Sequence, residues 1–216
     1  MGSGWTLGLD TSTVVAVGIA RDGEILATDI IADRMAHAEK LTPLIAASVE
    51  SAGVRLADLE QIVIGLGPGP FTGLRVGIVS AQVLASVLGC ALHGVCSLDV
   101  LATQYGPQPT DFVVATDARR HELYWARYGP DAVRVGEPQV STPDALPDLP
   151  VVGPGADLYA DRVRAVPGPR VLDPGILALA GPSLPDAGHE PLYLRRPDAT
   201  ESVRRKSVLH YAGGRR

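Results

Sequence analysis

The sequence predicts an α/β protein of two lobes, and two observations lead to this prediction. A pattern of strand, acidic turn, strand, turn and strand opens the chain and returns after residue 110. Between the two copies, the apolar strand Ile62-Val63-Ile64 runs through a loop of glycines and prolines into a long apolar helix. Strands that alternate with helical patterns are typical of the α/β class.

The first lobe is expected over residues 1–105. Its first three strands form an antiparallel meander, because Asp22-Gly23 between the second and third is a strong hairpin signal. Apolar residues at helical spacing then precede Gly53, a natural helix stop. The expected elements are strands at 6–10, 14–20, 24–31, 61–66 and 91–95, and helices at about 41–52 and 74–88.

A linker at 106–109 separates this lobe from a shorter second lobe, expected over residues 110–196. Here too a strand ends in an acid, Asp117, before a turn and a second strand. The expected elements are strands at 111–117, 121–128, 132–135, 151–152 and 171–172, and helices at 156–165 and 174–180. Residues 197–216 are expected to be a disordered basic tail.

Composition limits the function classes. The 216 residues are 46% hydrophobic, with a formal net charge of −5 and a pI near 5.5. An acidic chain is a poor candidate for gripping nucleic acid alone, and the one basic cluster, Arg204-Arg205-Lys206, reads as solvated tail. Cys90 and Cys96 lie in an apolar stretch, which favours free thiols. No signal peptide opens the chain and no apolar run reaches membrane-span length, so we expect a cytoplasmic protein without membrane contact.

The glycine-proline loop has three interpretations at this point: an anion or nucleotide site, a protein docking site, or a tight connection between strand and helix. A strand that turns through glycines into a helix presents free backbone N–H groups. Thr72 is placed to cap the helix. The residues of this motif loop are Gly67, Pro68, Gly69, Phe71, Thr72, Gly73 and Arg75. Since the loop lacks a lysine, we interpret it chiefly as the turn that positions the next helix.

The two lobes, each with an acid after its first strand, resemble the plan of the actin, sugar kinase and Hsp70 superfold. In that superfold the first two turns bind phosphates and a later glycine turn lies near the adenosine. The corresponding vestigial nucleotide loops here would be Asp10, Thr11, Ser12, Asp117, Gly153 and Gly155. We expect the second lobe to be truncated, and too short for a complete adenosine pocket.

Four segments resemble the bacterial TsaB (YeaZ) family over about residues 5 to 196. They are Leu9-Asp10-Thr11-Ser12, His37-Ala38-Glu39, the stretch from Gly67 to Gly77, and Pro191-Leu192-Tyr193-Leu194-Arg195. The resemblance implies a subunit of the machinery that makes threonylcarbamoyladenosine at position 37 of tRNAs reading codons that begin with adenine. It implies pairing with the similarly folded catalytic subunit TsaD, and a TsaE ATPase that joins the pair.

The catalytic relative holds a metal with a His-x-x-x-His motif, and the two histidine positions fall here on Ser97 and Leu101. Neither side chain is a useful metal ligand, and the five histidines are isolated from one another. No P-loop or nucleophile elbow is present. We therefore expect no metal, no catalytic residue and no cofactor of the chain's own, with a nucleotide at the complex interface left open. The alternative is an active small-molecule kinase or ATPase that uses Asp10 and Asp117 as paired acids.

Two helices are the predicted partner surface, since the helix at 74–88 is apolar or small on nearly every face. The predicted interface residues are Leu41, Leu44, Ile45, Ser48, Gly77, Ser80, Ala81, Leu84 and Ala85. We expect these helices to pack against a TsaD-like partner, or against a second copy when the chain is alone, and tRNA to be reached only through the complex. Complete burial within the chain is the competing interpretation.

Overall fold

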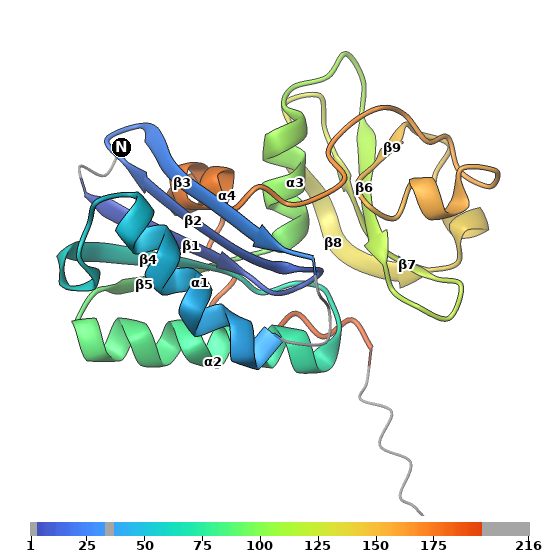
Figure 1. The fold of residues 1–216 in the computed structure, drawn as a ribbon. Helices are drawn as coiled ribbons and strands as arrows, with labels where there is room; N and C mark the ends of the chain where they lie inside the picture. Colours follow the sequence, from blue (N-terminus) through green and yellow to red (C-terminus); the bar gives the residue numbers. More distant parts are fainter. Residues whose placement is uncertain (1–3, 33–36, 196–216) are drawn as a thin grey trace, which may run out of the picture.

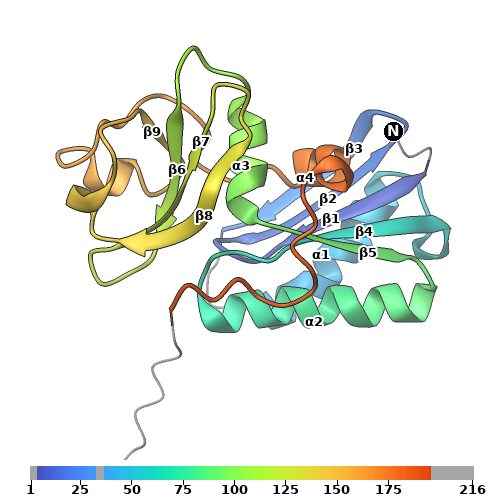
Figure 2. The same ribbon diagram turned by 180° about the vertical axis from the view of Figure 1, so that it is seen from behind.

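The computed structural model describes residues 4–32 and 37–195, and the side chains from residue 39 onward in the second range. The chain forms two lobes, each built on its own sheet, with one helix between them (Figures 1 and 2). The expected basic tail at 197–216 and the side chains of His37 and Ala38 lie outside the described residues.

The first sheet has five strands in the order β3-β2-β1-β4-β5. β1, β2 and β3 are the expected antiparallel meander, and β4 and β5 run parallel to β1. The helices α1 and α2 cover one face of this sheet (Figure 1). The bounds are β1 (Trp5–Asp10), β2 (Val15–Arg21), β3 (Glu24–Ile31), α1 (His37–Ser51), η1 (Leu56–Asp58), β4 (Leu59–Gly65), α2 (Phe71–Leu88) and β5 (Ala91–Val95).

The other face of the first sheet is covered by α4 (Pro174–Ala180), seen from behind in Figure 2. Gly8 of β1 pairs with Gly18 of β2, and a Cβ on either would overlap the α4 backbone. The two glycines therefore make a shallow notch that lets α4 lie directly on the strands. The side chain of Asp173 caps the helix by accepting from Gly175 N at 2.8 Å.

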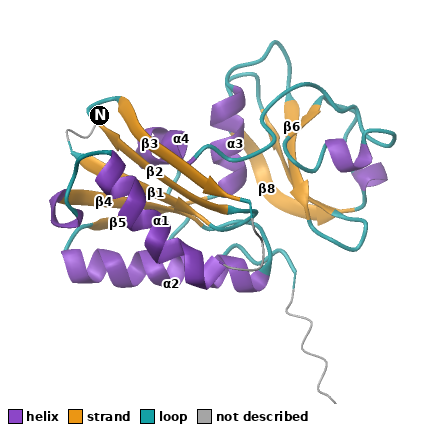
Figure 3. Ribbon diagram, viewed as in Figure 1, coloured by secondary structure: helices purple, strands orange, loops and turns teal. Residues whose placement is uncertain are grey.

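The second sheet has four strands in the order β8-β7-β6-β9. β7 pairs antiparallel with β6 and β8, and β9 runs parallel to β6. Within residues 106–173 the helical elements are two short 3-10 turns, which agrees with a truncated second lobe (Figure 3). The bounds are β6 (Phe112–Asp117), β7 (Leu123–Tyr128), β8 (Arg134–Ser141), η2 (Pro143–Ala145), β9 (Val151–Val152) and η3 (Asp157–Tyr159).

Three sequence-based expectations for the second lobe are wrong. The third strand covers Arg134–Ser141 rather than 132–135, and 171–172 is not a strand. The helix expected at 156–165 is only a 3-10 turn. The backbone at the end of this segment pairs with β9 instead, because Val151 N donates to Arg164 O and Val166 N donates to Val151 O.

The sequence interpretation missed α3 (Ser97–Tyr105), the helix between the lobes. Its buried Leu98 and Val100 belong to a core that includes Val63 of the first sheet, Phe112 of the second sheet and Leu177 of α4. The two lobes are therefore joined by a shared apolar core around α3 as well as by the covalent chain that connects them.

The chain returns to the first lobe at its C-terminal side, through η4 (Gly181–Ser183) and residues 184–195, which we call the strap. Ala187 N donates to Gly94 O of β5, and Leu192 N donates to Leu66 O after β4. Arg195 then reaches the second lobe, where its Nη1 donates to Ala118 O at 2.8 Å. Although α4 and the strap fall within the range 110–196 expected for the second lobe, α4 and most of the strap pack on the first sheet.

Helix α2 has 18 residues and is, by length and composition alone, long and apolar enough to cross a membrane. The expectation that no segment reaches this length is therefore wrong. One face of the helix is buried on the first sheet, through Leu74, Ile78 and Ala81. A core helix passes the same test of length and composition, so the test is weak evidence for a membrane span.

Candidate functional site

The turn after β1 is closed on the glycine-proline loop and on α3. Asp10 is fully buried, and its Oδ1 accepts hydrogen bonds from Ser12 N at 2.8 Å and Ser12 Oγ at 2.6 Å. Its Oδ2 accepts from Ser97 Oγ at 2.5 Å. Ser97 Oγ in turn accepts from Gly67 N at 3.0 Å. The carboxylate that the sequence analysis expects at a vestigial phosphate site is thus bound by the chain's own donors.

The glycines of the motif make room for this turn. Thr11 is buried and its Oγ1 donates to Gly73 O at 2.8 Å. A Cβ on Gly77 would overlap Thr11 Oγ1, and a Cβ on Gly65 would overlap Asp10 Oδ2. The acidic turn and the motif loop therefore form one packed unit, which we call the turn lock: residues 10–12, 65–77 and Ser97.

The second acidic turn lies in the second lobe, where Asp117 is half-buried and Arg119 and Arg120 are exposed. Asp117 Oδ1 accepts from Arg119 N at 2.8 Å. Arg119, Arg120 and His121 have φ angles of 61°, 55° and 62°, a left-handed stretch that L-residues adopt at a cost. A nucleotide at this turn stays a prediction.

The predicted glycine turn follows β9. Gly153 has a φ of 98°, a conformation that favours glycine. Gly155 N donates to Ala115 O of β6 at 2.9 Å. The two glycines therefore bring the end of β9 directly onto the central strand of the second sheet, close to where β6 ends in Asp117.

Helix α2 begins at Phe71, three residues before the expected start. Its N-cap is Pro70, whose carbonyl accepts from Leu74 N at 3.1 Å, and no side chain caps the helix. Thr72 lies inside the first turn and is exposed, so the expectation that it caps α2 is wrong.

Six of the nine predicted interface residues are buried in the chain's own core or sheet contact. They are Leu41, Ile45, Ser48, Gly77, Ala81 and Ala85. Leu44, Ser80 and Leu84 are half-buried. The prediction that the six form a free surface is wrong, because a helix that is apolar on all sides does not reveal from sequence which side faces the sheet.

The exposed side of α2 carries a different set of apolar residues, Val79, Val83 and Val87, which we call the valine stripe. Their side chains are 54%, 57% and 76% exposed. A spacing of four places them on one face of the helix. Exposed apolar residues are unremarkable singly, but three in a row along one helix indicate a contact surface.

Ser97 and Leu101, the positions where the sequence analysis expects no metal ligand, are both buried in α3. Asp99 lies between them in the same helix. Its Oδ1 accepts a hydrogen bond from Tyr128 OH at 2.7 Å and lies 3.1 Å from Arg134 Nε. Burial raises the pKa of Asp99 and raises the pKa of Cys96 to about 12. Among the described residues, no group of three or more His, Cys, Asp or Glu could hold a metal ion.

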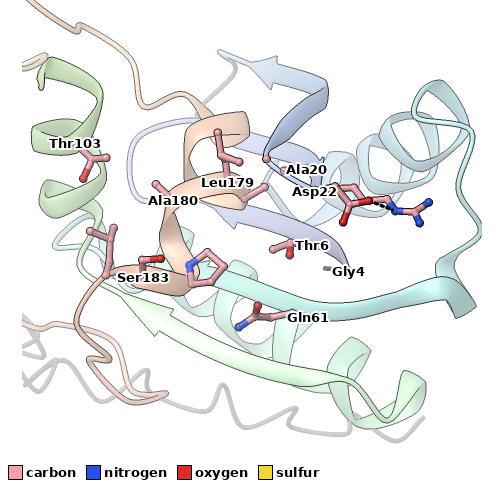
Figure 4. A pocket seen from close by; sticks show the side chains of 14 residues that line it. Gly4, Thr6, Ala20, Asp22, Gln61, Thr103, Leu179, Ala180 and Ser183 are labelled. Atoms are coloured by element: carbon pink, nitrogen blue, oxygen red, sulfur yellow. Dashed lines mark ion pairs between the residues drawn. The ribbon is translucent and has the colours of Figure 1, made fainter. Parts of the chain in front are cut away.

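A cavity of about 540 Å³ lies between the start of β1, β4, the C-terminal half of α3 and the α4–η4 segment (Figure 4). Thr6, Gln61, Thr103 and Ser183 supply polar atoms, and Leu179 is among the apolar lining residues (Figure 4). The volume suits a small molecule. None of the residues predicted as sites from the sequence lines this cavity.

Comparisons with known proteins agree with this architecture. The profile of TsaD, tRNA N6-adenosine threonylcarbamoyltransferase, matches residues 24–165. An uncharacterized protein of Mycobacterium tuberculosis is 41% identical over 199 residues, which are 89% of this chain and 92% of that protein. The tRNA threonylcarbamoyladenosine biosynthesis protein TsaB of Escherichia coli is 34% identical over 128 residues, 58% of this chain and 55% of that protein. The structure of YeaZ from Pseudomonas aeruginosa has a TM-score of 0.73 and 28% identity, covering 88% of this chain and all of that chain.

The two linked sheets and the acidic turn after the first strand define a two-lobed protein of the actin-like class. Within this class, the chain belongs to the TsaB (YeaZ) family. Members of that family are named for the biosynthesis of threonylcarbamoyladenosine in tRNA.

Proposed function

We propose that this chain is a non-catalytic subunit for N6-threonylcarbamoylation of adenosine 37 in tRNAs that read ANN codons. It acts by binding a TsaD-like catalytic subunit, and a TsaE-like ATPase joins the pair. The observation that supports this proposal is the valine stripe on α2, an apolar surface on a helix that already packs on its own sheet.

The stripe suits a partner helix. Three aligned valines without a charged residue between them can form a ridge that enters a groove on another helix. Burial of each remaining exposed valine surface contributes roughly 1 kcal/mol to association. The neighbouring residues Gln82 and Ser86 are uncharged, so their burial under a partner helix costs little desolvation free energy. A second copy of the chain occupies the same surface when the partner is absent.

The turn lock supports a non-catalytic role. Asp10 has its oxygens engaged by Ser12 and Ser97 and is fully buried, so it is not available as a general base. Substrate tRNA is reached through the complex, and any nucleotide lies at the complex interface. The corresponding location in the cell is the cytoplasm.

The proposal is tested by Val83→Glu, which puts a charge in the middle of the valine stripe. The matched control is Val133→Glu, because Val133 is 60% exposed and lies in the second lobe. We expect Val83→Glu to abolish co-elution with the TsaD-like protein of the same organism and to lower threonylcarbamoyladenosine in its tRNA, while Val133→Glu does neither. Unchanged co-elution of Val83→Glu contradicts the interface.

ATP turnover separates the proposal from the kinase or ATPase alternative. We expect the purified chain alone to hydrolyse no ATP above a blank. Turnover by the single chain that Asp117→Asn removes would contradict a non-catalytic role.

A further inference from the structure

Phe71, Arg75 and Tyr193 form one exposed group at the start of α2, which we call the arginine cluster. The Arg75 guanidinium carbon lies 4.0 Å from the centroid of the Phe71 ring. Arg75 Nε donates a hydrogen bond to Tyr193 OH at 2.9 Å. The Phe71 and Tyr193 rings stack with their centroids 5.0 Å apart. Both rings remain more than a third exposed, at 37% and 38%.

This packing fixes the direction of the Arg75 side chain. Its Nε is engaged by Tyr193, whereas its two Nη atoms have no protein partner among the described residues. An arginine held in this way presents a planar pair of donors, and the group that matches such a pair is a carboxylate or a phosphate bound through two oxygens. Because the cluster already orders the side chain, binding loses less conformational entropy than it would with a free arginine.

The position of Arg75 on the helix connects the cluster to the valine stripe. Arg75 is the only charged residue among the 18 residues of α2. It lies one helical turn before Val79, so the cluster and the stripe form one continuous surface along α2. Arginine and tyrosine are enriched among the residues that dominate binding energy at protein interfaces, where they are surrounded by apolar contacts.

The surroundings favour a protein over an RNA occupant. A nucleic-acid backbone repeats its charges along its length and needs several cations in a row. The surface that continues from Arg75 along α2 is apolar and uncharged. One cation at the end of an apolar stripe instead matches a protein surface that is apolar with a single acidic residue at its edge.

We infer that Arg75, held by Phe71 and Tyr193, is the specificity anchor of the α2 surface and binds a carboxylate of the partner protein. The inference rests on the proposed function, because it takes the TsaD-like subunit as the partner. The carboxylate belongs to an Asp or Glu at the rim of the partner's apolar surface. The anchor fixes the register of the two helices, which the three similar valines cannot do alone.

The test measures the Kd of the TsaD-like subunit by calorimetry at low and high salt. Arg75→Ala is expected to raise Kd about 30-fold, as for an interface hot spot, and to reduce its dependence on salt. Arg75→Lys keeps the charge and loses the paired donors, so we expect it to recover only part of the affinity. Tyr193→Phe keeps the ring and releases Nε, and we expect about a 5-fold rise in Kd. The control is Arg55→Ala, which removes an exposed arginine immediately before η1, and we expect it to leave Kd unchanged.

Each outcome has one meaning once circular dichroism shows that the variants are folded. A Kd of Arg75→Ala within twofold of the wild type, while Val83→Glu abolishes binding, overturns the anchor and leaves the proposed function intact. Loss of ultraviolet cross-linking to tRNA with an unchanged protein Kd overturns it in favour of RNA. Failure of the wild-type chain to bind the TsaD-like subunit at all overturns the proposed function, and the anchor with it.

Discussion

Substitution of Gly77 by alanine tests the turn lock, because two known effects oppose each other there. Alanine in a helix interior is favoured over glycine by about 1 kcal/mol. A Cβ at this position, however, would overlap Thr11 Oγ1, which is buried and donates to Gly73 O. To make room, Thr11 must shift and give up this hydrogen bond.

The loss of a buried hydrogen bond, with strain in a packed core, costs about 2–3 kcal/mol. This exceeds the gain in helix propensity, so we expect Gly77→Ala to lower the free energy of unfolding by about 1–2 kcal/mol. Urea unfolding followed by circular dichroism measures the change.

The double variant Thr11→Ala/Gly77→Ala separates the two effects. Removal of the Thr11 hydroxyl takes away the overlapping atom, so Gly77→Ala should be neutral or stabilising in that background. The reasoning is refuted if Gly77→Ala in the wild-type background stabilises the chain by about 1 kcal/mol, the value for an unconstrained helix position.

Three further predictions follow from the packing and the buried titratable groups. Gly18→Ala would place a Cβ against the Pro174 backbone and should lower stability and expose residues 174–195 to limited proteolysis. Gly4→Ala should do neither, because the atoms nearest to its Cβ belong to the end of the flexible Glu60 side chain. Burial raises the pKa of Asp99, so the folded chain binds the proton of this carboxyl group more tightly than the unfolded chain does, and the free energy of unfolding should fall as pH rises above 3.8. Asp99→Asn should flatten that decline. A pH profile that is unchanged by the substitution would contradict the prediction. Cys96 is buried with a pKa of about 12, and Cys90 is half-buried. Ellman's reagent at pH 8 should therefore label Cys90 first and Cys96 only after unfolding. Fast labelling of both thiols would contradict this prediction and show that the core around α3 opens.

The first lobe was predictable because its signals are local. Asp22-Gly23 marks the hairpin, and the alternation around it gives strands whose bounds agree with the structure within about two residues. Helix α3 was missed because Ser97 follows Cys96 directly after a strand, without a capping side chain or a turn residue between them. Its apolar residues are fixed by contacts with both lobes, which no local pattern contains.

The site was predictable as a set of residues but not as a set of roles. Asp10-Thr11-Ser12 and the motif loop are distinct in the sequence, yet only the structure brings Ser97 to Asp10 and Thr11 to Gly77. In the same way, the apolar character of α2 is plain from its sequence. Which of its residues face solvent depends on the sheet beneath it. Ala81, predicted as an interface residue, is buried against the sheet, whereas Val83 lies on the exposed side.

The return of α4 and the strap to the first sheet has a consequence for how the chain is made. During synthesis the strands of the first lobe are complete once residue 95 has been added, but the helix that covers their second face begins only at Pro174. At about 5–20 residues per second, roughly 4–16 s pass before that helix exists. The notch at Gly8 and Gly18 stays uncovered during this interval. The first lobe therefore reaches its final form only after the second lobe has been synthesised.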